Sequence, residues 1–288
     1  MRPSGWRAST TNEAWGVNPL NRALADATER LRPTSDTARL DAELLLAHAL
    51  DIERDVLLLA PPSGPAPAHF RDLIERRAEG EPVAYITGRR AFWNIELLVG
   101  PGALIPRPDS ETLIAAAIGH FGGADGPKRI LDLGTGPGTL LLAALDQWPL
   151  ATGLGIDASE EALGYARANA RRLGLAPRAE LRIGNWAEGI DELFDLVLIN
   201  PPYVAETAEL GPGVAEYEPA EALFSGPDGL DDYRRLAPVI GRLIAKGGLA
   251  AIEIGHDQAV SATQLFERAG HAVRLSHDLA GRARALLI

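Results

Sequence analysis

The chain has 288 residues, of which 46% are hydrophobic and 23% are charged, and its formal net charge is −11 at pH 7. This composition is typical of a globular protein and excludes a largely disordered or fibrous chain. The absence of cysteine excludes disulfides, thiolate metal sites and cysteine nucleophiles. No apolar run reaches the ~18 residues of a membrane span, and the first residues lack the apolar segment of a secretory signal. We therefore expect a cytoplasmic protein that does not bind membranes.

Charge and histidine spacing narrow the expected partners. Proteins that bind by neutralising phosphates usually carry excess positive charge, whereas this chain has 39 acidic and 28 basic side chains. We therefore expect no direct contact with nucleic acid. The six histidines show no paired spacing of metal ligands, so no metal site is predicted.

The N-terminal part of the chain is predicted to be helical. Residues 1–19 lack periodicity and contain several turn formers, so we expect a flexible tail. Residues 20–82 show helical periodicity, and Pro33 separates the first two helices. The residues predicted to share the buried face of the second helix are Leu40, Leu44 and Ala47. After a proline-rich loop, a further helix is expected near 69–79.

A change of period marks the end of this helical domain. Aromatic and β-branched residues around Gly88 predict a β-hairpin linker over residues 83–108. A two-proline turn follows and opens into a helix. Asp109 is predicted to cap this helix, and Glu111 lies in its favourable first turn.

From residue 129 onward, apolar strands alternate with helices. Strands are predicted at 130–133, 154–156, 181–183 and 194–199, before a long polar loop to about residue 229. A helix at about 231–245, a strand at 249–254, a helix at 258–269 and two final strands complete the chain. Alternating βα units predict an α/β fold with a largely parallel, doubly wound sheet.

The first strand ends in a glycine-rich turn, whose candidate ligand-binding residues are Gly134, Thr135, Gly136, Pro137 and Gly138. Missing side chains allow positive φ and the close approach of a ligand. A dinucleotide fingerprint would need glycine at position 139, which is a threonine. The spacing instead resembles the motif of class I S-adenosylmethionine methyltransferases, with a ligand-free tight turn as the alternative.

Asp157 follows the second strand of this region. In doubly wound nucleotide-binding folds an acid at this point accepts hydrogen bonds from both ribose hydroxyls. A role in the N-terminal cap of the next helix, together with Ser159, is compatible with the same position.

The fourth strand ends in an Asn-Pro-Pro-Tyr motif, formed by Asn200, Pro201, Pro202 and Tyr203. The prolines fix the backbone and remove two N–H donors, which leaves carbonyl acceptors. Asn200 adds a side-chain acceptor and Tyr203 a flat face. Such a clamp suits a planar NH₂ group conjugated to a carbonyl or a ring, and a tight turn without a ligand is the alternative.

The chain from about residue 38 to 288 resembles the PrmC/HemK family, the protein-(glutamine-N5) methyltransferases that modify peptide chain release factors. The motifs that carry the resemblance are Asp41-Ala42-Glu43, the run from Gly80 to Gly88, Phe92-Trp93, the run from Leu104 to Glu111, the glycine-rich turn, Asn185-Trp186, Asn200 to Tyr203, Tyr217-Glu218-Pro219, Asp228-Gly229-Leu230, Glu253-Ile254-Gly255 and the run from Asp278 to Arg282. Asn-Pro-Pro-Tyr also occurs in adenine-N6 methyltransferases, whereas the run from Leu104 to Glu111 and the helical domain are more specific.

The resemblance implies a class I methyltransferase: a Rossmann-like, mostly parallel seven-stranded sheet over residues 109–288. It implies S-adenosyl-L-methionine as cofactor, held by the glycine-rich turn, Asp157, Asn185 and Trp186, with Asn200 touching both cofactor and substrate. The implied catalytic residues are Asn200, Pro201, Pro202 and Tyr203. The implied substrate is the Gly-Gly-Gln glutamine of class I release factors, recognised partly through residues 20–82, and we expect a monomer. Asn185 and Ala283 stand where the family commonly has Asp.

Three alternatives remain at this point. A flipped adenine presents the same conjugated NH₂ group as glutamine, so an adenine-N6 methyltransferase is one of them. The acidic charge disfavours it, because duplex binding requires phosphate neutralisation. A glutamine methyltransferase acting on a ribosomal protein and a non-enzymatic cofactor-binding module are the other two.

Overall fold

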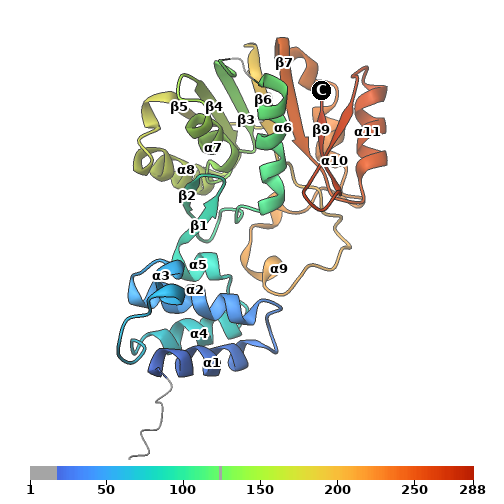
Figure 1. Ribbon diagram of the computed structural model, residues 1–288. Coiled ribbons are helices and arrows are strands. Elements are labelled where there is room, and N and C mark those ends of the chain that lie inside the picture. The colour runs from blue at the N-terminus through green and yellow to red at the C-terminus, as the bar shows by residue number, and fades with distance from the viewer. Residues whose placement is uncertain (1–17, 123–124) are drawn as a thin grey trace, which may run out of the picture. The chain divides into compact units, whose positions relative to one another are not determined.

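The computed structural model describes residues 18–122 and 125–288, so all but two residues of the predicted tail lie outside the described part. The chain divides into two compact units, Met1–Thr87 and Gly88–Ile288 (Figure 1). Within the described ranges, no helix is both long enough and apolar enough to cross a membrane.

The N-terminal unit is a bundle of short helices. They are α1 (Pro19–Leu31), α2 (Ala38–Leu50), α3 (Arg54–Leu59), α4 (Phe70–Ala78) and α5 (Val83–Thr87). The side-chain oxygen of Asn18 accepts from Leu20 N at 3.0 Å and caps α1. The core is formed mainly by apolar residues of α1, α2 and α4, among them Leu24, Leu31, Leu45, Leu46, Phe70 and Ile74.

Two predictions for this unit need correction, and one helix was missed. The buried face of α2 includes Ala42, Leu45 and Leu46, whereas Leu40 is 40% exposed, because three consecutive leucines left the phase of the helix ambiguous. The short helix α3 was not predicted. Residues 83–87 are helical instead of extended, because the Pro82 carbonyl accepts from the backbone N–H groups of Tyr85 and Ile86 and so begins a turn of helix.

The C-terminal unit contains an antiparallel hairpin and a seven-stranded sheet. The hairpin is formed by β1 (Arg89–Phe92) and β2 (Ile95–Leu98). The sheet is formed by β3 (Arg129–Leu133), β4 (Thr152–Asp157), β5 (Ala179–Ile183), β6 (Phe194–Ile199), β7 (Ile244–Glu253), β8 (Arg274–His277) and β9 (Ala283–Leu287). Its order is β5-β4-β3-β6-β7-β9-β8. The five strands from β5 to β7 are parallel and the pairs with β9 are antiparallel, which confirms the predicted fold class.

Helices cover this sheet. They are α6 (Glu111–Phe121), α7 (Thr139–Gln147), α8 (Glu160–Arg172), α10 (Asp231–Leu236) and α11 (Ala259–Arg268), whereas the short helix α9 (Val214–Tyr217) lies in the long loop after β6 (Figure 1). Contacts link α6 to α7 and α7 to α8, while α10 and α11 contact each other (Figure 1). One core of this unit lies between α10, α11 and alternate residues of the central strands, such as Leu131, Val197 and Ile252.

Two predictions for the C-terminal unit were wrong. The helix expected at 231–245 ends at Leu236, because Pro238 cannot continue it, and β7 already begins at Ile244. Asp109 does not cap a helix: Ser110 occupies the N-cap of α6, and Asp109 forms an ion pair with Arg284 at 2.8 Å. Glu111 lies in the first turn of α6, as predicted, and also accepts a hydrogen bond from the backbone N–H of Trp93 at 3.0 Å.

Candidate active site

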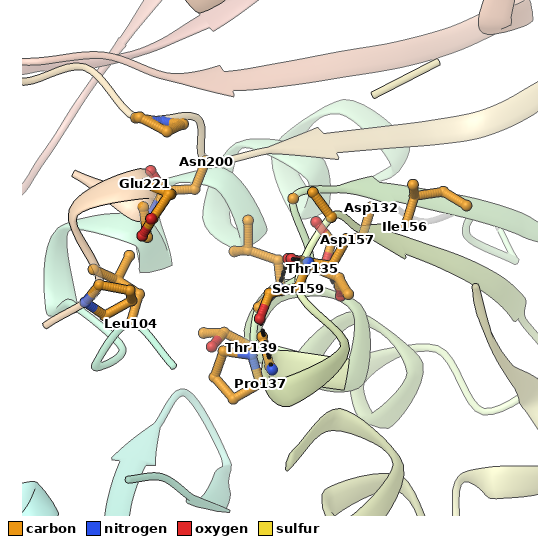
Figure 2. Close-up of a pocket in the computed structure, with 18 of the residues that line it drawn as sticks. Leu104, Asp132, Thr135, Pro137, Thr139, Ile156, Asp157, Ser159, Asn200 and Glu221 are labelled. Carbon is orange, nitrogen blue, oxygen red and sulfur yellow. Dashed lines mark hydrogen bonds between the residues drawn. The ribbon is translucent and has the colours of Figure 1, made fainter. Parts of the chain in front are cut away.

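A cavity of ≈ 620 Å³ lies at the carboxyl edge of the sheet, within the C-terminal unit. Its walls come from the segments that directly follow β3, β4, β5 and β6, because parallel strands end at a common edge. Figure 2 shows Asn200 and Glu221 on one side of this cavity, with Thr135 and Asp157 on the other. Two sequence motifs that lie more than sixty residues apart therefore face one space.

The glycine-rich turn divides into two parts. Gly134 and Gly136 line the cavity, at φ values of 73° and 56° that favour glycine. A Cβ atom on Gly134 would lie 3.4 Å from the Trp186 ring, so the backbone passes close to the indole. Gly138 has φ 87° but faces α7, where a Cβ atom would lie 2.8 Å from Leu142 Cδ1. Gly138 thus serves helix packing, while Thr135 and Pro137 also line the cavity.

Asp132 fixes the conformation of this turn. Its carboxylate oxygen Oδ2 accepts from Thr135 Oγ1 at 2.6 Å and from Leu141 N at 3.0 Å. Burial raises the pKa of Asp132 to about 7, although both hydrogen bonds act in the opposite direction. The side chain therefore joins the turn to the first turn of α7.

Asp157, the last residue of β4, is held by two backbone donors. Its Oδ2 accepts from Gly136 N at 2.7 Å, and its Oδ1 accepts from Ser159 N at 2.8 Å. Burial raises the pKa of Asp157, and these hydrogen bonds oppose that shift. A carboxylate offers about four lone-pair sites, so this one retains acceptor capacity on the cavity side. Ser159 caps α8 through Ala162 N, as predicted.

Trp186 forms a wall of the cavity in a strained left-handed conformation, at φ 48°. Its indole Nε1 donates to Asp232 Oδ1 at 3.2 Å, and the second oxygen of Asp232 accepts from Ser225 Oγ at 2.7 Å. The neighbouring Asn185 is exposed and donates to Glu188 at 2.8 Å. Asp232 was not predicted as a site residue, because an acid near the start of α10 has the pattern of an ordinary helix-terminal charge.

The Asn-Pro-Pro-Tyr motif occupies the opposite wall. Asn200 Nδ2 donates to Ser110 Oγ at 3.1 Å, which leaves the carbonyl oxygen Oδ1 as the acceptor that this side chain can offer to a ligand. Pro202 also lines the cavity, whereas Pro201 is buried. The Tyr203 hydroxyl points to the sheet and donates to Glu253 Oε1 at 3.1 Å. Burial and the Glu253 carboxyl raise the pKa of this phenol.

A buried acid connects the cavity rim to the loop after β6. The side chain of Glu218 accepts from Ile105 N at 3.0 Å and from the guanidinium of Arg107. Arg107 lines the cavity, so this pair fixes a charged residue at its edge. Glu218 was not predicted as a site residue, because an ion pair between distant loops leaves no local pattern in the sequence.

The lining of the cavity combines apolar surfaces with a few polar groups. Across the described ranges, no cluster of three or more His, Asp or Glu side chains could hold a metal ion. The cavity instead combines an indole face, glycine backbone, a carboxylate and an amide oxygen. Such a mixture of apolar walls and a few placed polar groups is typical of small-molecule sites.

Comparison with protein-family models gives two matches. Residues 22–88 match the PrmC N-terminal domain, and residues 125–254 match a methyltransferase domain. Among solved structures, a methyltransferase from Pyrococcus furiosus has a TM-score of 0.50 and 18% identity, over 74% of this chain and 96% of that one. This likeness supports the fold alone.

Curated relatives are similar to this protein over nearly the whole chain. The release factor glutamine methyltransferase of Caulobacter vibrioides is 42% identical over 280 residues, which cover 93% of this chain and 95% of the relative. The protein of the same name from Rhodospirillum rubrum is 42% identical over 275 residues, with 93% and 84% covered. That of Mycolicibacterium smegmatis is 38% identical over 272 residues, with 92% and 95% covered.

Proposed function

The chain belongs to the family of release factor glutamine methyltransferases, and on that basis we propose that it methylates the Gly-Gly-Gln glutamine of class I peptide chain release factors. The methyl group would pass from the sulfonium sulfur of S-adenosyl-L-methionine to the side-chain amide nitrogen, N5. Breaking the sulfur–methyl bond would leave S-adenosyl-L-homocysteine, and the methylated nitrogen would release one proton to solvent after transfer. The observation that carries this proposal is the placement of the Asn200 amide opposite the glycine-rich turn and Asp157, across one cavity.

The cavity has the size and the polar groups that the cofactor requires. Its volume of ≈ 620 Å³ lies within the range of small-molecule sites. Asp157 retains lone pairs for the two ribose hydroxyls, and the Trp186 indole offers a flat face for the adenine. Gly134 keeps the backbone close to that face. These residues would hold S-adenosylmethionine, which supplies an electrophilic sulfonium methyl group when bound.

The Asn-Pro-Pro-Tyr motif would increase the reactivity of the glutamine amide nitrogen that accepts the methyl group. An amide nitrogen is a poor nucleophile because its lone pair is delocalised into the carbonyl group, as the ~18–20 kcal/mol rotation barrier of a peptide bond illustrates. Asn200 Oδ1 and a backbone carbonyl of the two-proline segment can accept its two hydrogens, which raises electron density on the nitrogen and orients its plane. Orientation inside a cavity that excludes water supplies a further part of the rate enhancement.

The helical unit has a separate role in this proposal. Family resemblance implies that it contributes to recognition of the release factor, while the sheet unit carries the chemistry. The acidic net charge agrees with a protein substrate better than with a polyanion.

A transfer assay with methyl-labelled cofactor tests the proposed substrate class. The intact protein is incubated separately with a class I release factor, ribosomal proteins and nucleic acid containing adenine. We expect label in the release factor alone. Label only in ribosomal protein or nucleic acid would refute the proposed substrate, and label in none of them would refute the proposed activity.

A further inference from the structure

Glu253 is a buried acid beside the proposed clamp that the mechanism above does not use. It is the last residue of β7 and is 0% exposed. Ile199 of β6 pairs with Ile252 of β7, so the next residues along the two strands, Asn200 and Glu253, are neighbours at the carboxyl edge. The fold therefore places a carboxyl group directly behind the Asn-Pro-Pro-Tyr motif.

The hydrogen bonds and charges around this carboxyl offset only part of the free-energy cost of burying it. Oε1 accepts from the Tyr203 hydroxyl at 3.1 Å, and Oε2 has no hydrogen-bond partner among the described residues. Burial raises the pKa of Glu253 to about 7, while the hydroxyls of Ser110 and Tyr203 and the charge of Arg284 lower it. Arg284 is itself shared with Asp109 and Asp278. An apolar residue would avoid this cost, so fold stability alone does not explain an acid here.

The hydroxyls of Ser110 and Tyr203, which lie near Glu253, are both connected to the Asn-Pro-Pro-Tyr motif. Ser110 Oγ accepts from Asn200 Nδ2 at 3.1 Å, so its single proton is free to point to the carboxyl. Tyr203 donates to the same carboxyl from the other end of the motif. Above about pH 7 the Glu253 carboxyl is ionised and only accepts, so it fixes the direction of the Tyr203 hydroxyl. A Ser110 proton directed to the same carboxyl would leave the Ser110 oxygen as an acceptor, and this would orient the Asn200 amide with its own oxygen toward the cavity.

We infer that Glu253 is a positioning residue for methyl transfer, holding Asn200 through Ser110 and holding Tyr203 directly. This inference rests on the proposed function, since it assigns the acceptor of the glutamine amide to Asn200. Glu253 lies behind the cavity wall and acts only through these two residues.

Glu253→Gln is the central test variant, because it keeps the size of the side chain but replaces an acceptor oxygen with an NH₂ donor. We measure kcat and KM for the release factor at about pH 8, where the Glu253 carboxyl is ionised, together with cofactor affinity by titration calorimetry. We expect kcat to fall about tenfold or more, as for a lost hydrogen bond to a charged group, with cofactor affinity changed less than about threefold. Glu253→Asp, which keeps the carboxylate, should recover part of kcat.

Tyr233→Phe is the matched control. The Tyr233 hydroxyl also bonds to Glu253, but to its backbone oxygen at 3.0 Å, and its second bond is to Gln258 Oε1 at 3.3 Å. Each of Tyr203→Phe and Tyr233→Phe thus removes one hydroxyl that contacts Glu253, the first at its side chain and the second at its backbone oxygen. We expect Tyr203→Phe to lower kcat and Tyr233→Phe to lower only the thermal midpoint. Ser110→Ala should add little to the loss in a Glu253→Gln background, because both changes act on one chain of bonds.

Three outcomes would overturn the inference: wild-type kcat in Glu253→Gln, an equal loss of kcat in Tyr233→Phe, or fully additive effects of Ser110→Ala and Glu253→Gln. If Glu253→Gln does not fold, Ser110→Ala and Tyr203→Phe decide the question, and wild-type kcat in both would refute it. Failure of the wild-type protein to methylate the release factor would refute the proposed function instead.

Discussion

At the scale of single residues, the site depends on which polar atoms are already engaged. The Ser110 hydroxyl accepts a hydrogen bond from the Asn200 amide nitrogen, which leaves the Asn200 amide oxygen for a ligand. Asp157 accepts two backbone hydrogen bonds and can still accept others. Trp186 is held by Asp232 in a backbone conformation that non-glycine residues rarely adopt. Strain of this kind persists only where surrounding contacts fix it, and here it turns an indole toward the cavity.

Asn200→Ala tests the role of the clamp. Removing the acceptor should lower kcat by about a hundredfold or more, in the range of lost transition-state hydrogen bonds. Cofactor affinity should fall much less, because the glycine-rich turn, Asp157 and Trp186 are unchanged. Steady-state kinetics with calorimetric titration of the cofactor separate the two effects, and near-normal kcat would refute the clamp.

At the scale of elements, the strands and their connections were largely predictable, since buried apolar runs alternate with amphipathic helices. Both candidate binding motifs also came from the sequence, because each follows a strand that ends at the same edge. Distant contacts were not predictable. The bonds of Ser110 to Asn200, Glu218 to Arg107 and Trp186 to Asp232 join segments separated by tens of residues, and nothing local encodes them.

The three glycines of the turn after β3 also differ in role, which a spacing pattern could not show. Gly138→Ala would place a methyl group against Leu142 at φ 87°, so we expect the free energy of unfolding to fall by about 1–3 kcal/mol. Gly164→Ala is the control, because Gly164 lies within α8 with open space around it. It should leave stability unchanged or raise it by up to ~1 kcal/mol. Chemical denaturation measures both, and equal stability of the two variants would contradict the assigned packing.

At the scale of the whole molecule, stability and pH are linked through two buried acids of the sheet unit. The pKa values of Asp132 and Glu253 are raised to about 7 by burial. The native state therefore keeps protons that the unfolded chain has already lost above about pH 4.5. Their contribution to stability is complete below that pH and is lost as pH rises through about 7.

We therefore expect the free energy of unfolding to fall between about pH 4.5 and pH 7, by several kcal/mol, since a pKa difference of one corresponds to about 1.4 kcal/mol. Asp157, whose pKa burial also raises, adds to the same fall. The carboxyls with lowered pKa, such as Glu43 and Asp278, change stability only at more acidic pH. Chemical denaturation across this range provides the measurement. Asp132→Asn with Glu253→Gln should flatten the profile, and an unchanged slope in that double variant would contradict the assignment.

Site-resolved tandem mass spectrometry of the reacted release factor tests most directly whether the protein methylates one nitrogen atom of one glutamine. We expect one added methyl group on the side-chain amide of the Gly-Gly-Gln glutamine. It should be absent from release factor incubated with the Asn200→Ala variant for the same time. A methyl group on another residue, or an unmodified glutamine after prolonged incubation with the active protein and cofactor, would contradict the claim.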